Sequence, residues 1–107
     1  MRVNKIIGLG RRYADGTEAL EVAIVSPPPG IQPRAGCPVP FTIQIGAEQY
    51  LAGMRSTART GIWLCPDLRD SAGRRVTLAT VLLKTGFSKN QAVRFGRAAD
   101  VVTLLSR

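Results

Sequence analysis

The sequence predicts a mainly β protein, a small β-barrel with one short helix. Short runs with alternating apolar and polar residues follow one another, turn residues separate them, and only one segment has helical spacing. With 107 residues, 45% of them hydrophobic, the chain can bury one core without disulfides or a metal. We therefore expect a single domain over residues 1–107.

The first predicted element is a hairpin, formed by residues 2–13 and 18–25 around an Asp-Gly turn signal. In its second strand Leu20, Val22 and Ile24 alternate with smaller or polar residues, which indicates one buried face. The hairpin should therefore place an apolar side against the core.

A proline-rich connector is predicted next, over residues 26–40, which hold six of the seven prolines. Proline fixes φ and donates no backbone hydrogen bond, so this stretch should be extended and be neither a helix nor a central strand. A loop that crosses between barrel edges is favoured over a ligand for an aromatic groove.

Further strands are predicted after the connector. Phe41, Ile43 and Ile45 alternate with polar residues, as in a strand with one inward face, and a turn then leads into a partner strand. Residues 61–65 are apolar on both faces, which predicts a strand buried on both sides or one with a face reserved for a partner. Residues 66–75 are predicted to be mainly a polar connection.

The predicted helix runs from Leu78 to Lys84, with apolar residues at the i, i+3, i+4 spacing of one helix face. Thr77 can cap its beginning through the hydroxyl group. Gly86 can adopt the left-handed conformation that ends a helix, and Phe87 can then pack back onto the last turn. Two more strands follow, so the whole chain should contain six to eight strands.

This last third of the chain has a recognisable order of motifs. They are Gly73, Arg75–Leu78, the helix to Thr85, Gly86–Phe87, Ala92–Phe95 and Val101–Leu105. In this order residues 73–105 resemble the AbrB/MazE type of transition-state regulators and antitoxins. The resemblance implies a barrel of the double-psi, pseudobarrel or swapped-hairpin kind, and it implies DNA binding.

The chain departs from that family in three ways. Ala79 stands where the family usually has proline, and Asn90–Gln91 replace a Gly-Asp pair. In the family a swapped dimer completes the barrel, whereas here 72 residues precede the motif and can complete it within one chain. The resemblance therefore supports the fold more than DNA binding.

Positive charge is the most unusual feature of the composition. The chain has 15 Lys and Arg against 7 Asp and Glu, for a net charge of +8. Residues 1–50 contribute 5 − 4 = +1, and residues 51–107 contribute 10 − 3 = +7. An excess of positive charge in one half of a chain is typical of proteins that bind phosphate groups, although it is also common in proteins that bind nothing acidic.

The candidate nucleic-acid contacts are basic side chains of the second half, whose loops and strand ends can converge if the barrel forms. They are Arg55, Arg59, Arg69, Arg74, Arg75, Lys89, Arg94 and Arg97. Arginine binds phosphates in a bidentate manner. Trp63 is the candidate for stacking on a base, aided by Arg59. The alternative interpretation is that these cations are solvated outward positions and that Trp63 belongs to the core.

Two main functional hypotheses follow. The first is a non-enzymatic nucleic-acid-binding barrel, a small regulator or an antitoxin-like module. The second is an interaction or assembly module that binds an acidic protein through its basic face and through the apolar strand 61–65. One continuous positive face would favour the first hypothesis, and scattered charges beside an exposed apolar strand the second. A homodimer is compatible with both.

Enzymatic and metal chemistry find little support. There is no histidine, and Cys37 and Cys65 are far apart in the sequence, so no catalytic residue, metal ligand or cofactor is predicted. An enzyme that uses Cys65 or Asp67 is the weaker third hypothesis. No run of about 18 apolar residues indicates a membrane helix, and a cytoplasmic location is expected.

Overall fold

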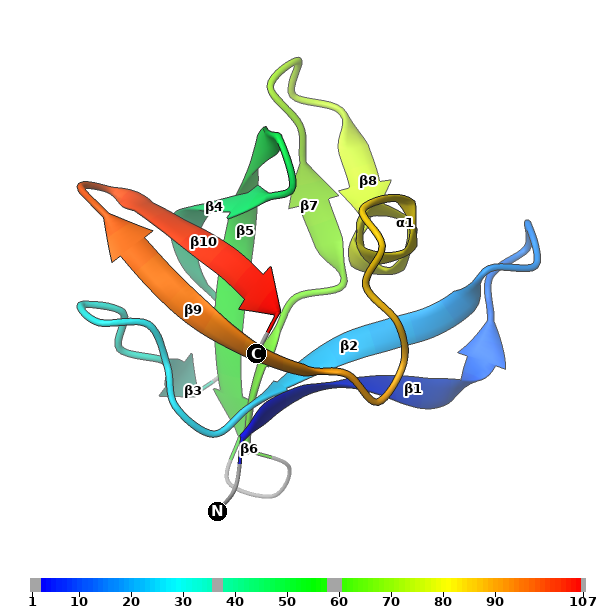
Figure 1. Ribbon diagram of the computed structural model, residues 1–107, viewed down its shortest axis with the longest axis horizontal. Coiled ribbons are helices and arrows are strands. Elements are labelled where there is room, and N and C mark those ends of the chain that lie inside the picture. Colours follow the sequence, from blue (N-terminus) through cyan, green and yellow to red (C-terminus); the bar gives the residue numbers. More distant parts are fainter. Residues whose placement is uncertain (1–2, 36–37, 58–60, 107) are drawn as a thin grey trace.

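In the computed structural model, which describes residues 3–35, 38–57 and 61–106, seven strands close into a barrel (Figure 1). The ring strands are β1 (Asn4–Arg12), β2 (Glu18–Ile24), β4 (Val39–Ile45), β5 (Glu48–Thr57), β6 (Gly61–Leu64), β9 (Ala92–Ala98) and β10 (Val101–Ser106). They pair in the order β4-β10-β9-β1-β2-β6-β5, and a β4–β5 pairing closes the ring. Within the ring only β10 and β4 run parallel. The predicted mainly β barrel is confirmed.

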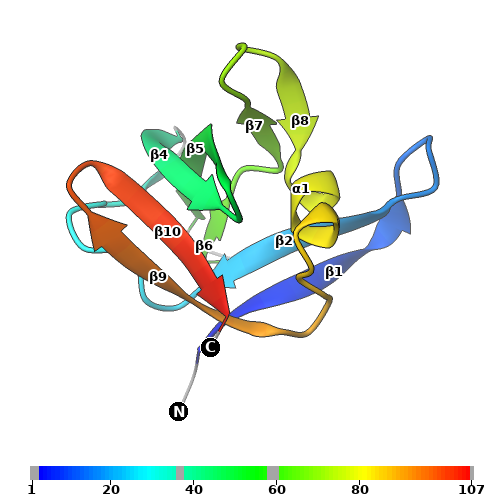
Figure 2. The same cartoon turned by 45° about the horizontal axis from the view of Figure 1, so that its top comes forward.

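Three further strands lie outside the ring. They are β3 (Arg34–Ala35), β7 (Asp67–Arg69) and β8 (Arg75–Thr77). β3 runs parallel to β5, whereas β7 pairs with β5 at Leu51 and forms an antiparallel hairpin with β8. This hairpin projects from the ring beside the helix (Figure 2). The described residues therefore contain ten strands, more than the six to eight predicted.

The strand β7 corrects the prediction that residues 66–75 are mainly a polar connection. Leu68 is only 1% exposed, while its neighbours Asp67 and Arg69 are exposed. This is the alternation of a half-buried strand, but one apolar residue among charged ones is too short a pattern to detect. The connector at 26–40 is also interrupted, because it contains β3 and because β4 already begins at Val39.

The helix α1 (Leu78–Lys84) begins and ends as predicted. At its start the Thr77 hydroxyl oxygen accepts a hydrogen bond from the Thr80 amide at 3.3 Å. At its end Gly86 has φ +93°, and the Phe87 amide donates to the Leu82 carbonyl at 2.9 Å. This is the Schellman geometry, in which a glycine without a Cβ turns the chain away from the helix axis.

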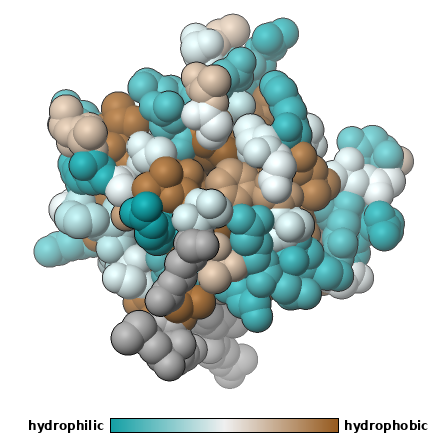
Figure 3. Space-filling model, viewed as in Figure 1, coloured by the Kyte–Doolittle hydropathy of each residue, from teal (hydrophilic) through white to brown (hydrophobic). Residues whose placement is uncertain are grey.

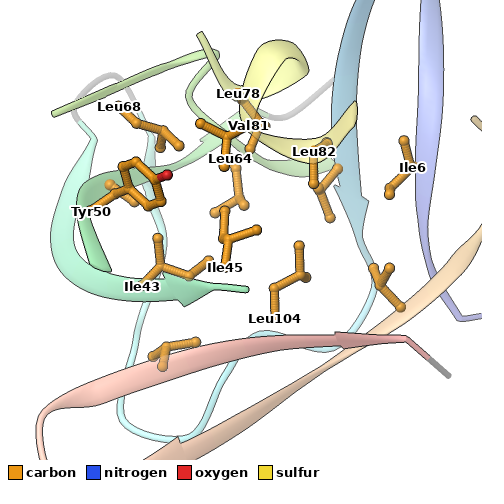
Figure 4. Packing of buried hydrophobic residues seen from close by; sticks show 14 of the residues in the cluster. Ile6, Ile43, Ile45, Tyr50, Leu64, Leu68, Leu78, Val81, Leu82 and Leu104 are labelled. Carbon is orange, nitrogen blue, oxygen red and sulfur yellow. The ribbon is translucent and has the colours of Figure 1, made fainter. Parts of the chain in front are cut away.

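The core fills the ring under the helix. Figure 4 shows Ile43, Ile45, Leu64, Leu82 and Leu104 converging from strands on opposite sides and from α1. All five are at most 3% exposed, so α1 covers apolar ends of the barrel strands that would otherwise meet water. On the face seen in Figure 3 hydrophobic residues gather across the middle, and hydrophilic residues lie mainly around them. No helix among the described residues is long and apolar enough to cross a membrane.

Candidate nucleic-acid interface

Strand register places three of the predicted arginines on one outward surface. Arg69 in β7 is paired with Leu51 in β5 and with Arg75 in β8. Residues paired across adjacent strands project to the same side, and so do alternate residues along one strand. Arg55 therefore shares the side of Leu51. We call this surface the arginine face, and its residues are Leu51, Gly53, Arg55, Trp63, Asp67, Arg69 and Arg75.

An open groove of about 420 Å³ lies in the middle of the arginine face. Its lining is mainly apolar, with arginines at its margins. The lining residues are Pro38, Pro40, Leu51, Ala52, Gly53, Arg55, Cys65, Pro66, Asp67 and Arg69. Gly53 is part of its floor: a Cβ there would lie 2.9 Å from the Pro38 Cβ and 3.2 Å from the Cys65 Sγ. Pro38 and Cys65, which line the groove, can therefore approach β5 this closely only because residue 53 has no side chain.

Arg55 occupies the boundary between the groove and Trp63. Its Nε donates a hydrogen bond to the Cys65 Sγ at 3.2 Å. In the β5–β6 ladder Arg55 is paired with Trp63, so the two Cβ atoms are about 5 Å apart. Trp63 is half-buried. The pairing places an arginine and a tryptophan opposite each other on the same side of the sheet, two residue types that stack on bases, although the predicted partner of Trp63 was Arg59.

Carboxylates offset part of this positive charge. Asp67 Oδ1 lies 3.6 Å from the Arg75 Nε, and Asp70 Oδ2 lies 3.3 Å from the Arg74 Nε. Both arginine side chains stay largely exposed, at 79% for Arg74 and 68% for Arg75, so these pairs are well solvated and weak. On the arginine face itself three guanidinium groups meet one carboxylate, which leaves a positive surface.

The tip of the β7–β8 hairpin is held by Asp70. Its Oδ1 accepts hydrogen bonds from the backbone amides of Arg74 at 2.9 Å and of Ala72 at 3.0 Å. These bonds favour the ionised carboxylate, the Arg74 amide most strongly, and lower the pKa of Asp70 below its ordinary value. Asp70 thereby fixes the turn from which Arg74 and Arg75 project.

The other predicted cations are not part of the arginine face. Lys89 pairs with Glu18 at 3.0 Å, and the two side chains lie over Gly8 of β1. Arg94 is exposed on β9, opposite Leu105 of β10. Arg97 donates to the backbone carbonyls of Ala99 and Pro29. We call Lys89, Arg94 and Arg97 the β9 group.

The eight predicted cations therefore separate into groups. The structure brings Arg55, Arg69 and Arg75 together, with Arg74 at the adjoining hairpin tip. It keeps the β9 group apart, and Arg59 lies outside the described residues. Sequence reasoning missed the groove, because its walls come from β4, β5 and the segments around Cys65 and Asp67. The one local signal was Gly53, a glycine within a strand, which often marks a close approach of other atoms.

The residues of the weaker enzyme hypothesis have structural partners. Cys65 is buried beside the Arg55 guanidinium, and Asp67 pairs with Arg75. Within the described ranges no three His, Cys, Asp or Glu side chains gather in a way that could hold a metal ion. Cys37 lies outside those ranges.

Comparison with known proteins gives no independent guide: no family model matches the chain, and neither do curated proteins or solved structures. The resemblance to the AbrB/MazE regulators therefore stays a prediction from the motifs in residues 73–105.

Proposed function

We propose that this protein is a non-enzymatic nucleic-acid-binding barrel that contacts its ligand through the arginine face. The observation that supports it best is the alignment of Arg55, Arg69 and Arg75 on adjacent strands beside Trp63. Arg55 lies four positions along β5 from Leu51, the partner of Arg69, which is about 13 Å along the strand. Arginines at this spacing can contact two different phosphates of one strand.

The electrostatics of the surface suit such a ligand. Each cation that contacts a phosphate releases condensed counterions, so binding gains free energy at low salt and loses it as salt rises. Each guanidinium group has five N–H donors and can contact a phosphate in a bidentate manner. Arg69 uses one of them on the Gly73 carbonyl at 3.1 Å, which leaves others for a ligand.

The test is titration of the protein with duplex DNA and with single-stranded RNA at several salt concentrations. The double variant Arg69→Gln/Arg75→Gln should bind more weakly, and the slope of log K against log salt should fall by about 1.4 for a single strand, or 0.7 per lost phosphate contact. The matched control is Lys5→Gln/Arg94→Gln, which removes the same charge from exposed positions on β1 and β9.

Three outcomes decide the matter. A smaller slope in the first variant alone supports the arginine face. An equal loss in both variants means that net charge acts without a defined face, and absence of binding at low salt removes the nucleic-acid function.

A protein-interaction module is the second candidate. Leu51 is 52% exposed although it is a large hydrophobic residue, and it lies beside Pro40 in the groove. Such a surface suits an apolar residue of a partner chain, and the arginines suit flanking acidic residues. Binding of an acidic peptide with no measurable binding of nucleic acid at low salt would favour this function.

A further inference from the structure

We infer that the groove over Gly53 takes an unstacked base, so that the preferred ligand is a single strand and not a duplex. This inference rests on the proposed function and makes it more specific. The groove has an apolar floor and walls. Its volume of about 420 Å³ falls in the size range of small-molecule sites, roughly 300–1,000 Å³. A base within a duplex is stacked and paired and cannot enter such a recess.

The charges around the groove match the repeating structure of a nucleic-acid strand. Arg55 lies at one margin and Arg69 at another, with Arg75 beyond it on β8. A nucleotide chain places an anionic phosphate on both sides of each apolar, planar base. The arginine face therefore complements such a chain: the apolar groove suits the base, and the arginines on both sides of the groove suit the phosphates that flank the base.

Two polar groups can contact a base in the recess, Asp67 at the edge of the base and Arg55 at the face of its ring. The exposed carboxylate of Asp67 at its margin can accept a hydrogen bond from an exocyclic amino group, as on cytosine or adenine. The bond from Arg55 to the Cys65 Sγ already restricts the Arg55 side chain. This side chain therefore loses less conformational entropy when a base stacks on its guanidinium group. Trp63 on the far side of Arg55 can support a neighbouring base.

The experiment compares three ligands of equal length at one low salt concentration: a single-stranded DNA, the same strand made only of abasic sugar-phosphate units, and the duplex. The normal single strand should bind at least about tenfold more tightly than the abasic strand, because base contacts are lost while the phosphates stay. Fluorescence of Trp63, the sole tryptophan, should change with the normal strand.

A pair of leucine variants localises the effect on the protein. Leu51→Ala removes a wall of the groove and should weaken binding of the normal strand about three- to fivefold, with no change in the salt slope. Leu83→Ala is the control, because Leu83 is similarly exposed, at 48%, but lies on α1 outside the groove.

The outcomes separate this inference from the proposed function. Equal affinity for normal and abasic strands, with the salt slope intact, overturns the base site and leaves phosphate binding standing. Tighter binding of the duplex than of the single strand also overturns it. Failure of all three ligands to bind removes both proposals. An acidic peptide that contains an apolar residue can also be added to the complex with the strand. If this peptide displaces the bound strand at a lower concentration than free strand does, the groove belongs to a protein partner.

Discussion

The arginine face and the β9 group carry similar charges and differ in how the fold uses them. On the arginine face, register aligns side chains from β5, β7 and β8 on one side of adjacent strands, around a recess. In the β9 group, Arg97 bonds to backbone carbonyls, Lys89 pairs with Glu18, and Arg94 is exposed on β9. Positive charge in a sequence thus forms one shared surface only where the register of the strands brings the cations together.

The largest expected effect comes from core substitutions, one beneath the arginine face and one on the side of the β9 group. Leu68→Ala and Leu104→Ala should each cost about 2–5 kcal/mol of unfolding free energy, since both residues are at most 3% exposed. Leu68 anchors β7, so its loss should also loosen the hairpin that carries Arg69 and Arg75. Leu104→Ala, on the β9–β10 side, should keep the affinity of the folded protein. Urea denaturation and binding titration of both variants measure this, and equal affinities would contradict the role of β7 as the support.

A smaller effect should separate stability from binding. Arg97→Ala loses hydrogen bonds to two backbone carbonyls and should cost about 1 kcal/mol of stability, with unchanged nucleic-acid affinity. Arg75→Ala breaks only a solvated ion pair, so it should cost less than about 0.5 kcal/mol and yet weaken binding. Thermal unfolding and titration of the two variants give the four values. If Arg97→Ala weakened binding as much as Arg75→Ala, the two regions would not differ in function.

The smallest expected effect is a local response to acid at the hairpin tips. The folded-state pKa of Asp70 is lowered by the Arg74 amide, and that of Asp15, in the β1–β2 turn, by the Thr17 amide. A lowered pKa means that each carboxylate stabilises its turn above the unfolded pKa. This stabilisation is lost as the pH falls through the folded value.

Amide chemical shifts report on the two tips separately. The chemical shift of the Arg74 amide should therefore change as the pH falls through the pKa of Asp70. The variant Asp70→Asn should abolish this change and leave the pH dependence of the Thr17 amide shift as it is. An Arg74 amide that titrates equally in Asp70→Asn would show that another group holds the turn.

Local patterns were sufficient for much of the fold. The helix could be predicted to the residue because its cap at Thr77 and its end at Gly86 depend on neighbours within a few positions. The β1–β2 hairpin and the inward face of β4 were likewise predicted from alternation. The strand β7 was missed because its pattern has one apolar residue, Leu68, and its burial comes from the distant strands that it covers.

The candidate site was only partly predictable for the same reason. The residue types were apparent from composition, and Arg55, Arg69 and Arg75 were among the candidates. Which cations share a surface depends on pairings such as Leu51 with Arg69, between segments that no local pattern connects. The recess at Gly53 likewise exists only where Pro38 and Cys65 approach it.

By itself the sequence determined the kind of protein: a basic chain of alternating strands with one capped helix, enough apolar residues for a single core, and no histidine for metal or acid–base chemistry. The tertiary structure alone decided which arginines meet, which are tied to the backbone, and where a groove opens between them. The physical reason is that propensity and alternation act over a few residues, whereas a surface is assembled by register between strands far apart in the chain.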